Sequence, residues 1–108
     1  MIIKKELIDN WLAGLPKRVR LRIGTILAYL EAQRSWRNIP YVKKIRGCDD
    51  VYELIFKINN IQYRPLGCYG PGKGEFTLLV GATKKGKIWV PTDAITTAEK
   101  MAKLIRQR

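Results

Sequence analysis

The segment from Val51 to Leu66 constrains the fold most, because its pattern specifies how two strands pair. Two apolar runs flank Asn59-Asn60, and asparagine tolerates the positive φ that a two-residue hairpin turn requires. The register that this turn predicts brings three pairs opposite one another: Ile58 and Ile61, Phe56 and Tyr63, and Leu54 and Pro65. Because proline cannot donate to a strand ladder, a strand edge or a local break is expected at Pro65. A slip of one residue would exchange the two faces of the hairpin, so the register is a sharp prediction.

The predicted register collects polar side chains on the face opposite those pairs. This face carries Glu53, Ile55, Lys57, Gln62, Arg64 and Leu66. An arginine in the middle of a strand is costly unless it has an anionic partner or ligand, and an ion pair with Glu53 is the purely structural explanation. In the functional interpretation, Arg64 and Lys57 converge with the Lys84-Lys85 turn on a phosphate. A guanidinium binds two phosphate oxygens as a planar fork, and lysine adds a mobile charge.

Helical patterns stand on both sides of this hairpin in the sequence. Residues 4–15 are expected to form a short helix whose apolar stripe contains Leu7, Ile8, Trp11, Leu12 and Leu15. Pro16 suits the first turn of a second helix, which runs to about Gln33 and buries Val19, Ile23, Ile26, Leu27 and Leu30. A third helix is expected from Asp93 to about Gln107, with a buried side of Ile95, Ala98, Met101, Ala102 and Ile105.

The remaining segments favour loops and one further strand. Residues 35–50 indicate a loop with a short extended piece, and residues 67–74 a glycine-rich turn. Residues 75–83 indicate a strand with Phe76, Leu78 and Val80 on one face. The predicted fold class is therefore α+β, with two N-terminal helices packed on a small antiparallel sheet and a C-terminal helix. A chain of 108 residues fits a single domain, 1–108.

The charge of the chain indicates an anionic partner. Twenty-one Lys or Arg residues stand against nine Asp or Glu, a formal charge of +12, and such a charge gathers polyanions. Nucleic acid, an acidic protein and an anionic membrane surface are the candidates. No apolar run is long enough to cross a bilayer, and the N-terminus lacks the order of a signal peptide. We therefore expect a soluble cytoplasmic protein with no membrane attachment.

The absence of histidine excludes several kinds of site. Without His, no Ser-His-Asp triad, Cys-His dyad or histidine metal site is possible. Cys48 and Cys68 cannot fill a tetrahedral zinc site and are expected to be reduced, so no metal or other cofactor is expected. The glycine-rich run 67–74 lacks the Ser or Thr of a phosphate-binding P-loop and precedes a strand rather than a helix. We therefore expect a hairpin loop there and no nucleotide binding.

Several short motifs occur together along the chain. They are Val51-Tyr52-Glu53-Leu54, Tyr63-Arg64, a strand that ends in Lys84-Lys85, and Pro91 with Ala98 around the last helix. A further motif, Trp11-Leu12-x-x-Leu15-Pro16, joins the first two expected helices. In combination these motifs resemble the RelE/ParE superfamily of bacterial toxins, and most closely its HigB-like, phage-derived branch. The resemblance spans nearly the whole chain.

The resemblance implies a small toxin of a type II toxin–antitoxin pair, neutralised by a cognate antitoxin that is acidic or carries a helix-turn-helix. Many members of the superfamily are ribosome-dependent endoribonucleases that cut mRNA in the decoding site. By this resemblance Arg64 contacts the scissile phosphate, and Lys85, with Lys84, is the basic residue after the next strand. Lys57 and Glu53 lie on the strand that supplies further active-site groups. Three more residues are expected to contact RNA: Lys87, Lys73 and Gln62.

The chain departs from its relatives at positions that bear on catalysis. It has no histidine and no C-terminal tyrosine, and Pro65 stands where an aliphatic residue usually follows the strand arginine. RNA can nevertheless be cleaved when its own 2′-OH attacks the adjacent phosphate. The protein then needs only to position the strand and to stabilise the charged transition state. Glu53 is the conventional candidate for the base, and Lys57 and Lys84 are alternatives.

The sequence leaves two other functions open. One is a ParE-like inhibitor of DNA gyrase that has no nuclease activity. The other is a non-toxic basic module that binds RNA or the ribosome, in which Trp36, Tyr41 and Trp89 stack on bases. Packing inside the protein is the structural explanation for the same three aromatic residues.

Overall fold

The computed structural model describes residues 1–106. Helices stand near both ends of the chain, eight consecutive strands lie between them, and most strands are only three residues long. In chain order, the elements are β1 (Ile2–Lys4), the 3₁₀ helix η1 (Glu6–Ile8), α1 (Asp9–Ala13), α2 (Lys17–Ala32), β2 (Val42–Lys44), β3 (Tyr52–Leu54), β4 (Phe56–Ile58), β5 (Ile61–Tyr63), β6 (Leu66–Tyr69), β7 (Glu75–Val80), β8 (Thr83–Lys85), β9 (Ile88–Val90) and α3 (Ala94–Arg106).

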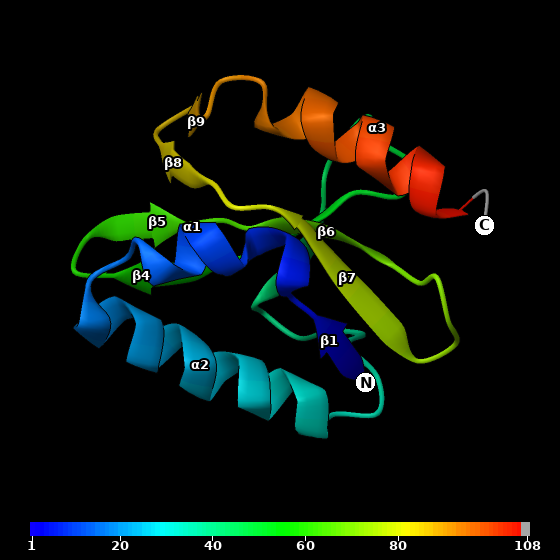
Figure 1. The fold of residues 1–108 in the computed structure, drawn as a ribbon, viewed down its shortest axis with the longest axis horizontal. Coiled ribbons are helices and arrows are strands. Elements are labelled where there is room, and N and C mark those ends of the chain that lie inside the picture. The colour runs from blue at the N-terminus through cyan, green and yellow to red at the C-terminus, as the bar shows by residue number, and fades with distance from the viewer. Residues whose placement is uncertain (107–108) are drawn as a thin grey trace.

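The strands form two sheets. One has five strands in the order β1-β7-β6-β3-β2, and the other has four in the order β4-β5-β8-β9. β1 runs parallel to β7, whereas the other pairings are antiparallel. Figure 1 shows α2 and α3 on opposite sides of the strands. The fold therefore has a helix on each side of the strands.

The hairpin register predicted from Asn59-Asn60 is confirmed. Both asparagines adopt a positive φ, of 53° and 65°, and the ladder brings Ile58 opposite Ile61 and Phe56 opposite Tyr63. The expected break at Pro65 is also present: β5 ends at Tyr63, β6 begins at Leu66, and the pairing passes from one sheet to the other. Across this break the Leu54 amide donates to the Pro65 carbonyl at 3.0 Å, so the register continues although the strands are interrupted.

The predicted fold class is wrong, because two N-terminal helices do not pack on one small antiparallel sheet. Within the part of the chain that the structure describes, nine strands and three α-helices form, so the fold is rich in sheet. The start of the expected helix 4–15 is different, because Lys4 ends β1, which pairs with β7 and buries Ile3 in the core, and Glu6–Ile8 form the 3₁₀ helix η1. Only Asp9–Ala13 of that helix is α-helical, and Leu7 of its expected apolar stripe is 57% exposed.

The two longer helices form where predicted and bury different kinds of side chain, although Ile95, Met101 and Ile105 of the expected buried side of the third helix are only half-buried. α2 buries five large aliphatic residues: Val19, Ile23, Ile26, Leu27 and Leu30. With Leu54, Phe56, Tyr63, Phe76 and Leu78 from the strands they form the α2 core. α3 buries three alanines, Ala94, Ala98 and Ala102, which form the α3 core together with Cys48, Leu66, Cys68, Leu79 and Ala82. The expected end of the third helix at Gln107 lies outside the described residues.

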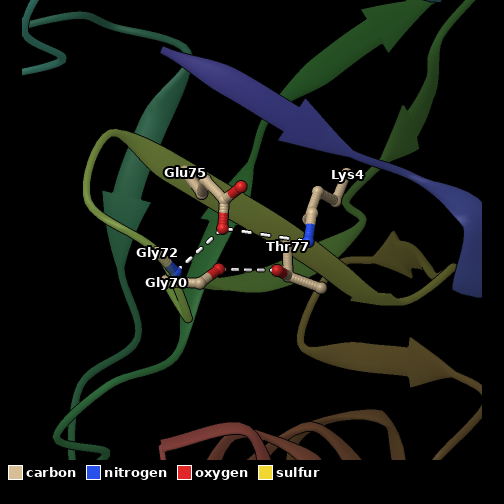
Figure 2. Close-up of polar contacts among 5 residues, drawn as sticks. All are labelled: Lys4, Gly70, Gly72, Glu75 and Thr77. Atoms are coloured by element: carbon tan, nitrogen blue, oxygen red, sulfur yellow. Dashed lines mark hydrogen bonds and ion pairs between the residues drawn. The ribbon is translucent and has the colours of Figure 1, made fainter.

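Residues 70–74 form the turn between β6 and β7, in agreement with the hairpin loop expected there, whereas residues 67–69 of the expected turn belong to β6. In Figure 2 the Gly72 amide donates to Glu75 Oε1 at 2.8 Å, and Thr77 Oγ1 donates to the Gly70 carbonyl at 2.6 Å. Lys4 of β1 reaches the same Glu75 oxygen at 3.8 Å. These contacts close the turn and connect it to β1.

The structure gives one finding on membranes. Of the helices in residues 1–106, none is both long enough and apolar enough to cross a lipid bilayer.

Candidate nucleic-acid interface

Arg64 follows β5, and both of its terminal nitrogens are held. Nη1 donates to Glu53 Oε1 in an ion pair, and Nη2 donates to Gln62 Oε1. The Arg64 and Glu53 side chains are only 16% and 6% exposed. Nε, in contrast, has no hydrogen-bond partner among the described residues. The guanidinium is thus fixed in place: Nε is buried, and Nη1 and Nη2 each keep a second N–H for a further acceptor.

The hairpin register explains why these three side chains meet. Side chains alternate between faces along a strand, so Gln62 and Arg64, two residues apart, share a face. Glu53 lies across the hairpin from Leu66, on the side opposite the buried Leu54. The ion pair with Glu53 that explains Arg64 structurally is therefore formed. Arg64 also lines a cavity.

This cavity, here called the Arg64 hollow, has a volume of about 730 Å³. Its lining comes from β2 and the loop that follows it, from Arg64, from β8 and β9, and from the start of α3. Five cationic and two acidic side chains line it: Lys43, Lys44, Arg46, Arg64 and Lys84, with Asp49 and Glu53. An excess of positive charge in a concave space strengthens attraction for an anion.

Lys84 lines the Arg64 hollow and belongs to a row of paired residues that crosses the four-stranded sheet. Lys57 pairs with Gln62, Gln62 with Lys84, and Lys84 with Trp89, so these four side chains share one face. Lys84 Nζ lies 5.1 Å from the centroid of the Trp89 ring, a cation–π distance. Trp89 therefore presents a half-buried aromatic face beside the cations.

Five of the residues expected at the site are not among the described residues that line the Arg64 hollow, and of these only Gln62 contacts Arg64. Lys85 follows Lys84 in β8, so its side chain points to the other face, where it is exposed. Lys87 lies in the exposed turn between β8 and β9, and Lys73 in the separate β6–β7 turn. Lys57 shares the sheet face but is exposed beyond the hollow. The structure thus brings Glu53, Gln62, Arg64 and Lys84 together.

Sequence reasoning missed the basic residues on and after β2. Lys43 lies directly across from Glu53, and Lys44 and Arg46 also line the hollow. A signal for them is present in the sequence, since residues 34–46 contain five Lys or Arg and no Asp or Glu. The pairing of β2 with β3 is what aligns these charges with Glu53, and the short run Val42–Lys44 is too polar to indicate a strand.

The thiols near the site carry no sign of activation. Both cysteines are buried and free, as expected, and Cys48 lines the Arg64 hollow. Burial raises the pKa of the Cys48 thiol, and the neighbouring Glu99 raises it further. Burial also raises the pKa of the Cys68 thiol. Nucleophilic chemistry needs the thiolate, so cationic side chains, rather than sulfur, are the chemically capable groups of this site.

A metal ion is held by several His, Cys, Asp or Glu side chains that lie close together. Within residues 1–106, no group of three or more His, Cys, Asp or Glu side chains is arranged to hold a metal ion.

Comparison with known proteins gives one match. The model of a family described as "Phage derived protein Gp49-like (DUF891)" matches residues 10–103. No curated protein and no solved structure matches the chain significantly. The matched range includes every residue named above as lining the Arg64 hollow, and it agrees with the resemblance to a phage-derived branch.

Proposed function

The chain belongs to the Gp49-like family of phage-derived proteins, which is related to RelE/HigB-like toxins, and from this premise we propose that it is a toxin that cleaves mRNA on the ribosome. The observation that carries the proposal is the fixed guanidinium of Arg64 in a cation-lined hollow. A phosphate is the anion that such a group binds best, because the two fit in shape and charge.

The geometry supports a reaction in which the RNA supplies its own nucleophile. The 2′-oxygen forms a bond to the adjacent phosphorus while the bond from phosphorus to the 5′-oxygen breaks, leaving a 2′,3′-cyclic phosphate and a 5′-hydroxyl. The Arg64 guanidinium, through the second N–H groups of Nη1 and Nη2, and the Lys84 ammonium stabilise the charge that develops on the phosphoryl oxygens. These donors are already oriented, so little reorganisation is required when the reaction occurs.

Glu53 is the favoured proton acceptor. Arg64 contacts its Oε1, so Oε2 is the oxygen that takes the proton from the 2′-OH. Lys84, which lines the same hollow as Glu53 and Arg64, returns a proton to the departing 5′-oxygen. A positioned acid or base typically contributes about 10²–10⁴-fold to a rate. The ribosome would add to this by holding the message in a reactive conformation.

A toxin of this kind requires an antitoxin. The hollow has more cationic than acidic side chains, and the whole chain has a charge of +12. An acidic segment of the partner would therefore cover the Arg64 hollow and exclude RNA from it. The site of action would be the cytoplasm, where the ribosomes are.

Controlled expression of matched variants tests the proposal. Wild-type protein should arrest growth and produce cleaved mRNA ends, whereas Arg64→Ala should lose cleavage at least 100-fold, a typical effect of removing one such donor. Arg18→Ala removes the same charge from an exposed position on α2 and should behave as wild type. Arg64→Lys distinguishes the two contributions of the arginine, its planar donors and its positive charge. The variant retains a cation beside Glu53 but loses the planar donors.

Different outcomes would contradict the proposal in different ways. Growth arrest with intact message and broken DNA would favour inhibition of gyrase. No arrest would favour a basic module that binds RNA without toxicity. Thermal unfolding of each variant must accompany the assay, since removing Arg64 leaves a buried carboxylate unpaired.

A further inference from the structure

A second cavity lies beside the first, at the same edge strand. It has a volume of about 400 Å³, and is here called the Tyr69 hollow. Its lining includes the cationic residues Arg34, Arg37 and Lys44, and the tyrosines Tyr52 and Tyr69. No carboxylate is among the described residues that line it, so its charge is purely positive.

β2 separates the two hollows. Lys43 pairs with Glu53 and faces the Arg64 hollow, whereas Lys44 pairs with Tyr52 on the opposite side of the strand. Lys44 lines both hollows. β2 is the last strand of its sheet, so an extended ligand can pass from one hollow to the other around this edge without crossing the core.

The tyrosines of the second hollow are held by their neighbours. The Tyr69 ring lies 4.9 Å from that of Tyr52 and 5.1 Å from that of Phe76, both edge-on, and 6.0 Å from that of Trp36. Trp36 is itself fixed, because its Nε1 donates to the Leu30 carbonyl at 2.8 Å. Although it is packed in this way, Tyr69 is 40% exposed. A rigid ring that keeps part of its surface exposed is suited to contact a flat apolar ligand.

We propose that the Tyr69 hollow binds a second nucleotide of single-stranded RNA, with its base on Tyr69 and its phosphate on Arg37, while Arg64 holds the phosphate that reacts. This inference rests on the proposed function, since it assigns more of the same substrate. An aromatic face beside cations binds an unpaired nucleotide, whose base stacks and whose phosphate pairs with the charge. An acidic peptide would use the charge but would have no need of the rings.

Binding of an uncleavable RNA tests the assignment. The probe is a labelled ten-nucleotide RNA methylated at every 2′-oxygen, which cannot attack its own phosphate, and affinity is measured at several salt concentrations. Tyr69→Leu should weaken binding about tenfold, the typical effect of losing one stacked base, and Tyr69→Phe should retain it. Arg37→Ala should weaken binding and lower the salt slope by about 0.7, as expected for one lost phosphate contact. The exposed Arg18→Ala control should match wild type.

The outcomes separate this inference from the proposed function. If wild type cuts mRNA but Tyr69→Leu and Arg37→Ala bind RNA as Arg18→Ala does, the second site is overturned and the cleavage proposal stands. If binding follows the predicted pattern without any cleavage on ribosomes, the RNA site stands and the nuclease proposal falls. Tight binding of a ten-residue polyglutamate probe that is lost in Arg37→Ala, with RNA binding unchanged, would assign the hollow to an acidic protein and overturn the inference. Since Arg37 is exposed, its variant remains informative even if Tyr69→Leu unfolds.

Discussion

The two sides of the strands are covered by helices that pack in opposite ways. On the α2 side, large aliphatic side chains fill the space between helix and sheet. On the α3 side, three alanines face the strands, so little side-chain volume separates the helix from the sheet. The Arg64 hollow lies on the α3 side, where Ile95 of α3 lines it. The tightly filled α2 core therefore supports the fold, while the α3 core, which contains smaller side chains, leaves room at its edge for charged groups.

The α2 core should be the more sensitive to lost volume. Leu30 is completely buried, and Leu30→Ala should reduce the free energy of unfolding by about 2–5 kcal/mol through lost burial and an unfilled cavity. Chemical denaturation measures this change. Leu104→Ala on α3 removes the same atoms from a residue that is 66% exposed and should change stability by about 0.5 kcal/mol or less. Equal losses for the two variants would contradict the comparison.

The α3 core should instead be sensitive to added volume. Ala98 is completely buried against the strands, so Ala98→Leu should destabilise the protein by about 1–3 kcal/mol by forcing α3 away from the sheet. Because the start of α3 borders the Arg64 hollow, the same variant should also lower RNA binding. A stable Ala98→Leu variant would show that α3 is not closely packed. Ala13→Leu, at an exposed position on α1, is the matched control.

The pH dependence of stability should also distinguish the α3 core, because both thiols lie in it. Burial raises the pKa of Cys48 and Cys68, so above the ordinary thiol range the folded protein retains protons that the unfolded chain has lost. Stability should therefore fall as pH rises through and above about 8.5. The Cys48→Ala, Cys68→Ala double variant should show a weaker decline. A decline of the same size in that variant would assign the effect to other groups.

The smallest expected effect is at the surface of α3. Arg106 forms an ion pair with Asp50, and their side chains are 56% and 34% exposed. Arg106→Ala should cost at most about 1 kcal/mol, and the difference from wild type should shrink in 1 M salt because exposed pairs are screened. A large loss that persists in high salt would mean that this contact holds α3 in place.

Local patterns predicted part of this molecule well. The hairpin register follows from Asn59-Asn60, and the break follows from Pro65, since both depend on backbone chemistry within a few residues. α2 and α3 follow from their apolar periodicity. Of the candidate site, Glu53, Gln62 and Arg64 come together because one hairpin positions all of them.

The remaining features depend on contacts between distant parts of the chain. β1 exists because Ile2–Lys4 pairs with β7 more than seventy residues later, and no local pattern indicates that pairing. β2 is a polar three-residue strand that forms only beside β3, so the basic residues that it brings to both hollows are invisible to periodicity. The resemblance to known toxins predicts Lys85 at the site together with Lys84, but the side chains of neighbouring residues in a strand point to opposite faces.

The parallel pairing of β1 with β7 has a consequence for the order in which the protein matures. The first strand to be synthesised acquires its neighbour only after residues 75–77 have emerged, and non-local pairings of this kind form slowly. Until then Ile3 has no sheet in which to be buried, and Lys84 has not been made. During translation the chain therefore gains its complete sheet and its cationic centre late and nearly together, so a nascent fragment has neither.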